Sequence, residues 1–111
     1  MPTKQEIFNT VKAHLLSQNK QARNEFSCTY LTTAGLKCAI GCLIPDGHPG
    51  QDALGGVRSL LEIYPDLAAM ILPVGSDVDF LVALQRVHDH NLPDVWDRKL
   101  SEIAARYGLE N

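Results

Sequence analysis

The stretch that decides the fold of this 111-residue chain reads Gly35-Leu36-Lys37-Cys38-Ala39-Ile40-Gly41-Cys42-Leu43-Ile44-Pro45-Asp46-Gly47. It places two of the three cysteines inside a compact apolar run that ends at a proline and a glycine. Periodicity alone does not separate a strand from a short buried helix in so short a run. Because alanine and leucine are good helix formers, and a four-residue step puts both sulfurs on one helix face, we expect a helix over residues 36–44. Gly41 within it indicates the close approach of a neighbouring element.

The segment before this stretch contains one clear helix and one candidate strand. Thr3 and Glu6 form a capping box, in which each side chain satisfies a backbone donor of the other residue. Apolar residues then recur at helical spacing as far as Leu15. Residues 26–32 are rich in aromatic and β-branched side chains, which predicts a short strand followed by a turn at Gly35.

The segment after it is predominantly helical. Residues 45–56 are rich in proline and glycine and predict a loop, the part of the chain expected to be most mobile. Helical spacing begins again at Val57, and a second capping-box pattern links Ser76 with Asp79. Gly108 is the expected C-cap of the last helix.

These patterns predict a mainly α fold, with one compact helical domain over residues 1–111. At most, a small β-hairpin is expected near residues 26–37. The expected core consists of the apolar positions on the inner faces of these elements, namely Phe8, Val11, Leu15, Cys38, Ile40, Leu43, Leu61, Leu81, Leu84, Trp96, Leu100 and Ile103.

Composition excludes several classes of function. The formal net charge is −3 and the basic residues are scattered, which argues against non-specific binding to nucleic acid. No apolar run approaches the length of a membrane span, and the N-terminus has no signal-peptide hydrophobic region. Three cysteines without such a signal indicate free thiols in a reducing compartment, so we expect a cytoplasmic protein.

The cysteines and histidines show no recurring metal-binding pattern. A zinc site usually combines a tight Cys-x-x-Cys pair with a second pair of ligands. The candidates here are Cys28, Cys38, Cys42 and His48, and their spacing fits no such pattern. We therefore expect buried structural thiols, with no metal and no cofactor.

A cysteine nucleophile is the alternative role for these thiols. Cys38 is the best candidate, because a helix N-terminus and the neighbouring Lys37 both lower the pKa of a thiol. The mechanism also needs a histidine base and a third group that orients the base. The candidates are His88 or His48 as the base, and Asp46 or Asp89 as the orienting group. No local signature surrounds any cysteine, which favours packing over catalysis.

The sequence His88-Asp89-His90 is the most suggestive polar cluster. On a helix, His88 lies one turn beyond Leu84 and shares its apolar face, whereas His90 lies near the helix end. Two histidines two residues apart do not form the pair of ligands that a helix offers a metal. We expect His88 to be a partly buried histidine with one hydrogen-bond partner, and His90 to be exposed.

The GLKCAIGCLIPD segment at residues 35–46, together with residues 84–89 and Trp96, resembles small uncharacterised accessory proteins of bacteriophages and prophages. The resemblance runs over most of the chain. It implies a bacterial host cell as the setting, where such proteins bind and redirect or inhibit a host component, including defence systems. It carries over no site residue.

We therefore expect a non-enzymatic binding protein that inhibits or sequesters a host factor, such as a defence component or its small nucleotide signal. The acidic balance favours a protein partner. A nucleotide would need cations for its phosphates, and Lys37, Arg58 and Arg86 are the few that apolar residues flank. The alternative is a small cysteine- or histidine-dependent enzyme that uses Cys38 with His88 or His48.

Overall fold

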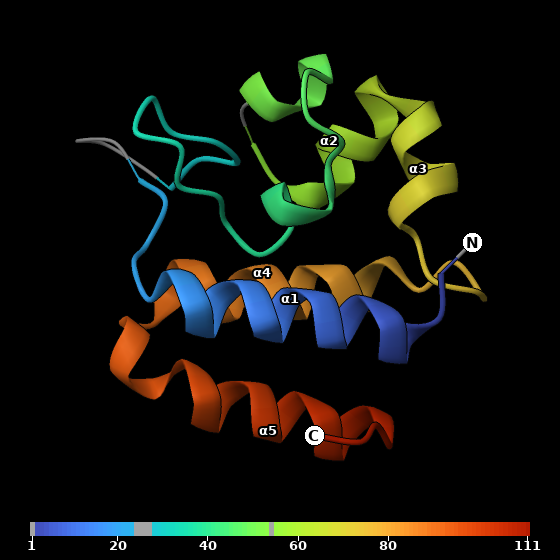
Figure 1. Ribbon diagram of the computed structural model, residues 1–111. Helices are drawn as coiled ribbons and strands as arrows, with labels where there is room; N and C mark the ends of the chain where they lie inside the picture. The colour runs from blue at the N-terminus through green and yellow to red at the C-terminus, as the bar shows by residue number, and fades with distance from the viewer. Residues whose placement is uncertain (1, 24–27, 54) are drawn as a thin grey trace.

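Three long helices form the body of the molecule. The computed structural model describes residues 2–23, 28–53 and 55–111. Helices α1 (Lys4–Gln18) and α4 (Val78–His90) lie side by side, and α5 (Trp96–Tyr107) packs against both. Figure 1 shows α5 on one side of this pair, with the middle of the chain on the other. The prediction of a mainly α fold is confirmed.

The middle of the chain covers α1 and α4 with short elements. Helices α2 (Val57–Ile63) and α3 (Pro65–Ile71) follow each other directly, and α2 packs on α4. Single turns of 3-10 helix occur at η1 (Gly41–Leu43), at η2 (Pro49–Asp52), and at η3 (Pro93–Val95), which leads into α5. The radius of gyration is 12.9 Å, close to the value of about 13 Å expected for a compact 100-residue domain.

The helix ends follow local rules of sequence. The capping box of Thr3 and Glu6 is present in full, and Gly108 ends α5 with a φ of 67°. The N-cap of α4 lies one residue later than predicted. Asp77, rather than Ser76, is the N-cap of α4, and its carboxylate accepts a hydrogen bond from the backbone of Phe80. Aspartate and serine are equally good N-caps, so sequence alone does not choose between these neighbours.

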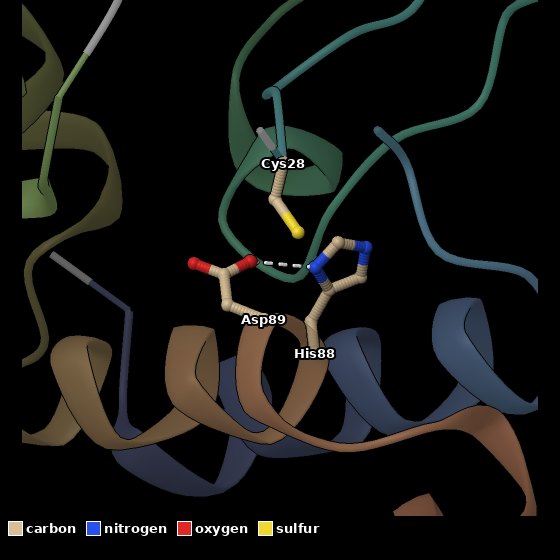
Figure 2. Close-up of side chains that lie close together, drawn as sticks. All are labelled: Cys28, His88 and Asp89. Atoms are coloured by element: carbon tan, nitrogen blue, oxygen red, sulfur yellow. Dashed lines mark hydrogen bonds and ion pairs between the residues drawn. The ribbon is translucent and has the colours of Figure 1, made fainter. Parts of the chain in front are cut away.

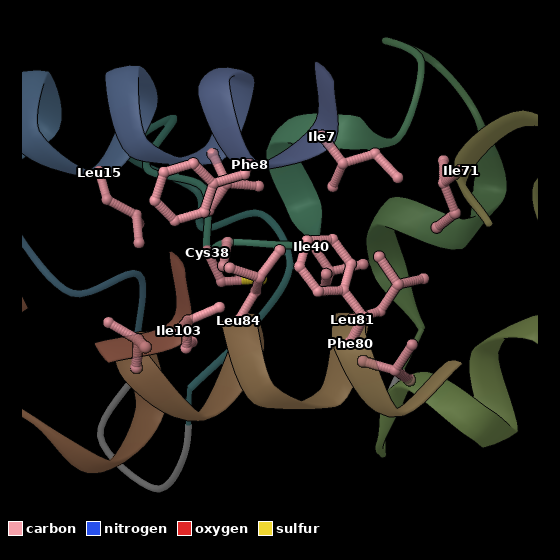
Figure 3. Close-up of a cluster of buried hydrophobic side chains, with 14 of the residues drawn as sticks. Ile7, Phe8, Leu15, Cys38, Ile40, Ile71, Phe80, Leu81, Leu84 and Ile103 are labelled. Carbon is pink, nitrogen blue, oxygen red and sulfur yellow. The ribbon is translucent and has the colours of Figure 1, made fainter. Parts of the chain in front are cut away.

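The core lies between α1, α4 and α5 and continues beneath the middle of the chain (Figure 3). Ten of the twelve predicted core residues are buried. Leu43 and Leu61 are only partly buried, at the margin of the core. His88 lies on the apolar face of the helix, as predicted, but it is fully buried rather than partly buried.

The prediction of a helix over residues 36–44 is wrong. Only η1 is helical there. Residues 36–38 pair with a neighbouring segment, and Ala39 and Ile40 form a turn that leads into η1. The backbone of Cys38 donates to the Tyr30 carbonyl, and Thr32 donates to the Leu36 carbonyl. These bonds to a neighbouring segment take up groups that a helix would have paired internally.

The expected hairpin is reduced to isolated pairings. Leu31 and Lys37 form a single antiparallel bridge around the turn at Gly35, and no strand forms within residues 28–37. Phe26 and Ser27, the first residues of the predicted strand, lie outside the described residues. The predicted loop at residues 45–56 contains η2, whose Gly50 and Gln51 are buried.

The close approach predicted at Gly41 is confirmed. A Cβ atom added there would lie 2.0 Å from the carbonyl oxygen of Tyr30. Such a separation is far inside van der Waals contact, so the two backbone segments touch where only glycine fits. No helix of the described residues is both long enough and apolar enough to cross a membrane.

Replacing Gly41 with alanine should push the two backbone segments apart and lower the free energy of unfolding by about 3 kcal/mol. Urea denaturation measures the change. Gly56→Ala is the matched control, since an added Cβ at Gly56 would meet nothing within 4 Å and the φ there is −80°. The control should change stability by less than about 1 kcal/mol. Equal effects of the two variants would contradict the close contact.

Candidate functional site

Three adjoining hollows lie along α4. The largest, of about 600 Å³, lies between α4 and the segment that contains Cys28. The second, of about 290 Å³, lies between α2 and α4, and the third, of about 240 Å³, lies between α4 and α5. Gln85 and Asp89 line the first two, and Arg86 and His90 line the second and third. We call the three hollows together the α4 groove.

Basic side chains gather along this groove. Five of the chain's ten lysines and arginines line it, whereas Asp89 and Glu102 are the only acidic residues of the described chain that do so. The five are Arg23, Arg58, Arg86, Lys99 and Arg106. Two of them have acidic neighbours: Arg58 pairs with Asp79, and Lys99 lies 3.6 Å from Glu102. The groove is thus a basic face on a chain of net charge −3.

Asp89 lies where the first two hollows meet, and hydrogen bonds fix its carboxylate. Gln85 Nε2 donates to Asp89 Oδ1 at 2.9 Å, and the His88 ring bonds the same oxygen through Nδ1 at 2.7 Å. Gln85 is itself held, because its Oε1 accepts from the backbone N–H of Ile40 at 2.9 Å. The Asp89 side chain is 28% exposed, and Figure 2 shows its second oxygen pointing away from the ring.

His88 is hydrogen-bonded through both ring nitrogens. The backbone N–H of Ala22 donates to Nε2 at 2.8 Å, so Nε2 must be the unprotonated nitrogen. Nδ1 therefore carries the proton and donates it to Asp89. The ring also stacks on Trp96, with centroids 5.5 Å apart. We expected one hydrogen-bond partner for His88, and the structure shows two. Because Nε2 already accepts a hydrogen bond, the ring has no free lone pair with which to act as a general base.

Cys28 forms a cluster with His88 and Asp89. From the sequence we considered Cys28 as a zinc ligand but not as a nucleophile. Its sulfur and ligand atoms of His88 and Asp89 all lie within 4.8 Å of one another (Figure 2). Burial, and next the negative charge of Asp89, raise the pKa of the Cys28 thiol to about 11. The thiol is therefore protonated at neutral pH and is a poor nucleophile. Residues so far apart in the chain give no spacing signal that could have revealed the cluster.

The same three residues do not fit a metal ion as they are arranged. A metal bound at His88 Nδ1 would displace the proton to Nε2, where it would face the Ala22 N–H. Cys28 would also have to lose its proton despite its raised pKa. Metal binding would thus require breaking the hydrogen bond that orients the ring.

The other two thiols are structural. Cys38 is fully buried and its sulfur accepts from the backbone N–H of Gly41, while the Cys42 thiol donates to the Ala39 carbonyl. Burial raises the pKa of each to about 12. The prediction that its surroundings lower the pKa of the Cys38 thiol is therefore wrong, because desolvation outweighs every favourable contact. The ring of His88 bonds Ala22 and Asp89 rather than Cys38.

His48 anchors a loop. Its Nδ1 accepts from the backbone N–H of Gly50 at 2.9 Å, and its Nε2 donates to Asp66 at 2.6 Å. The bond from His48 holds the pKa of Asp66 below its ordinary value. His48 is not among the residues that line the α4 groove, and its ring nitrogens are occupied like those of His88.

The three cations predicted to bind phosphate do not all lie together. Arg58 and Arg86 line the same hollow of the α4 groove. Lys37 lies elsewhere and pairs with Asp46 at 2.7 Å, so the proposed orienting group Asp46 serves a surface ion pair. Asp89, the other proposed orienting group, does bond His88, but that ring makes no bond to Cys38.

Comparisons with known proteins return no match, whether against family models, curated proteins or solved structures.

All three cysteines should react slowly with iodoacetamide at pH 7, because a raised pKa leaves little thiolate below it. We expect labelling at least about tenfold slower than that of free cysteine, whose pKa is about 8.5. Cys38 should be slowest, and labelling of Cys28 should accelerate as the pH rises toward about 10, closer to its raised pKa. Peptide mass spectrometry assigns each site. Rapid labelling of one cysteine at pH 7 would instead demonstrate an activated thiol.

His88→Gln should lower the free energy of unfolding by about 1–3 kcal/mol, because glutamine can replace at most one of the two ring hydrogen bonds. Urea denaturation at pH 7 measures the loss. His90→Gln is the control, since His90 is exposed at the end of the same helix, and it should change stability by less than about 0.5 kcal/mol. A loss no greater than that of the control would refute the buried hydrogen-bond role.

Proposed function

We propose that this protein binds a small nucleotide in the α4 groove and sequesters it without altering it chemically. The observation that carries the proposal is the gathering of half of the chain's basic side chains on one concave face of an acidic protein. Arginine binds phosphate groups well, because its planar guanidinium donates two parallel hydrogen bonds.

The size of the groove suits such a ligand. Small-molecule sites usually enclose about 300–1,000 Å³, and the largest hollow alone measures about 600 Å³. A nucleic-acid backbone instead needs an uninterrupted row of cations. Asp89 and Glu102 interrupt the row here, which favours a compact ligand over a polymer.

The chemistry of the thiols supports binding over catalysis. A cysteine enzyme needs a thiolate and a free base. The pKa of each thiol is raised, and the rings of His88 and His48 are hydrogen-bonded through both nitrogens. The alternative of a cysteine- or histidine-dependent enzyme through Cys38 therefore gains no support from these contacts.

The biological setting follows only from the resemblance to phage accessory proteins. In that setting, a protein that sequesters a nucleotide would remove a signal from a host defence system. A host protein as the partner is the competing form of the proposal. The gathering of Arg86, Lys99 and Arg106 around one hollow favours the nucleotide, because cations that line the same hollow can bind one phosphate group together.

Isothermal titration calorimetry at low salt tests the proposal with nucleoside diphosphates, triphosphates and cyclic nucleotides. At least one class should bind, and Arg86→Gln should weaken binding about tenfold or more through loss of a charge-assisted hydrogen bond. Arg98→Gln is the matched control, because Arg98 is an exposed arginine that does not line the groove. It should change affinity by less than about twofold, since distant surface charges are largely screened.

Chromatography of the released ligand should return it intact. Turnover of a bound nucleotide would overturn the non-enzymatic part of the proposal. Absence of binding by every nucleotide class would overturn the proposal itself, and equal losses in Arg86→Gln and Arg98→Gln would move the site away from the groove.

A further inference from the structure

We infer that Asp89 is the specificity-determining residue of the groove and accepts a hydrogen bond from the nucleoside part of the ligand. The inference rests on the proposed nucleotide-binding function. The donor that it requires is a ribose hydroxyl or an N–H group on the base edge.

The carboxylate of Asp89 is oriented before any ligand arrives. Gln85 and His88 both bond Oδ1, and an oxygen of this kind has two acceptor positions. Oδ1 is therefore saturated. The Cys28 thiol also hydrogen-bonds the Asp89 carboxylate, so Oδ2, which has two acceptor positions of its own, keeps at least one of them for a donor in the hollows that Asp89 lines. Because Gln85 and the ring of His88 are themselves held, the carboxylate is pre-organised and loses little conformational entropy when it binds a donor.

Charge is distributed unevenly along the groove. A carboxylate repels phosphate, so the region around Asp89 is the least favourable place for the anionic groups of the ligand. The hollow between α4 and α5 is lined by three cations, Arg86, Lys99 and Arg106, against the single carboxylate of Glu102, and it is the most favourable of the three hollows. Phosphates bound there would place the uncharged nucleoside toward Asp89, which lies one turn along α4 from Arg86.

Oδ2 should bind a hydrogen-bond donor on an uncharged part of the ligand. Ribose offers hydroxyl donors, and guanine offers adjacent N–H donors, whereas inorganic pyrophosphate offers no nucleoside group. A site built to accept a hydrogen bond discriminates strongly against analogues that lack the donor. Asp89 should therefore distinguish a nucleotide from pyrophosphate of comparable charge.

Calorimetry on Asp89→Asn tests the inference with GDP and pyrophosphate as paired probes. The amide oxygen of asparagine can still accept from Gln85 and His88, but an NH₂ group then replaces the open acceptor. We expect GDP affinity to fall about tenfold or more, while pyrophosphate affinity stays within about twofold or increases as the negative charge is removed. Asp94→Asn, which removes an exposed carboxylate outside the groove, should affect neither probe by more than about twofold.

Two further probes identify the donor on the wild-type protein. Weakened binding of IDP, which lacks the exocyclic amine, assigns the contact to the base, and weakened binding of 2′,3′-dideoxy-GDP assigns it to the ribose. Equal losses of GDP and pyrophosphate in Asp89→Asn, or no loss of either, would overturn the inference while leaving the groove as the binding site. If the wild-type protein binds neither GDP nor pyrophosphate nor any other nucleotide, the proposed function itself fails.

Discussion

Ala22 donates its backbone N–H to one nitrogen of the buried His88 ring, and the other nitrogen bonds Asp89. These bonds join the chain that leaves α1 to the C-terminal end of α4, and the stacking of the same ring on Trp96 adds α5. A buried imidazole that lost either partner would keep the desolvation cost without its compensation. One side chain thus links the chain after α1, the end of α4 and the start of α5, and it also orients the carboxylate that lines the groove.

The local features of the fold were accessible from sequence because each depends on residues close together in the chain. The capping box at Thr3, the C-cap at Gly108 and the place of His88 on an apolar helix face follow from hydrogen-bonding capacity, glycine geometry and helical periodicity. Periodicity did not show that the burial of His88 is complete. The close contact at Gly41 was also accessible, since a glycine within an apolar run is typical of a place where another backbone lies close.

The features that the sequence did not predict correctly depend on contacts between distant segments. The non-helical form of residues 36–38 is set by hydrogen bonds with Tyr30 and Thr32, which override the helix preference that alanine and leucine give residues 36–44. The approach of Cys28 to His88 requires the whole path of the chain between them. The groove likewise forms only when the helices pack against one another. The sequence suggested Arg58, Arg86 and Lys37 as separate phosphate-binding cations. It could not show that Arg58 and Arg86 line the same hollow while Lys37 lies elsewhere.

The uneven distribution of charge also affects how the molecule meets other molecules. Five basic residues line the groove, whereas Asp89 and Glu102 are the acidic residues of the described chain that do so, on a chain of formal net charge −3. A local excess of positive charge in a groove raises the concentration of anions near it, over a Debye length of about 10 Å at 0.1 M salt. Net charge alone therefore misrepresents the groove, whose lining carries the opposite sign from the chain as a whole.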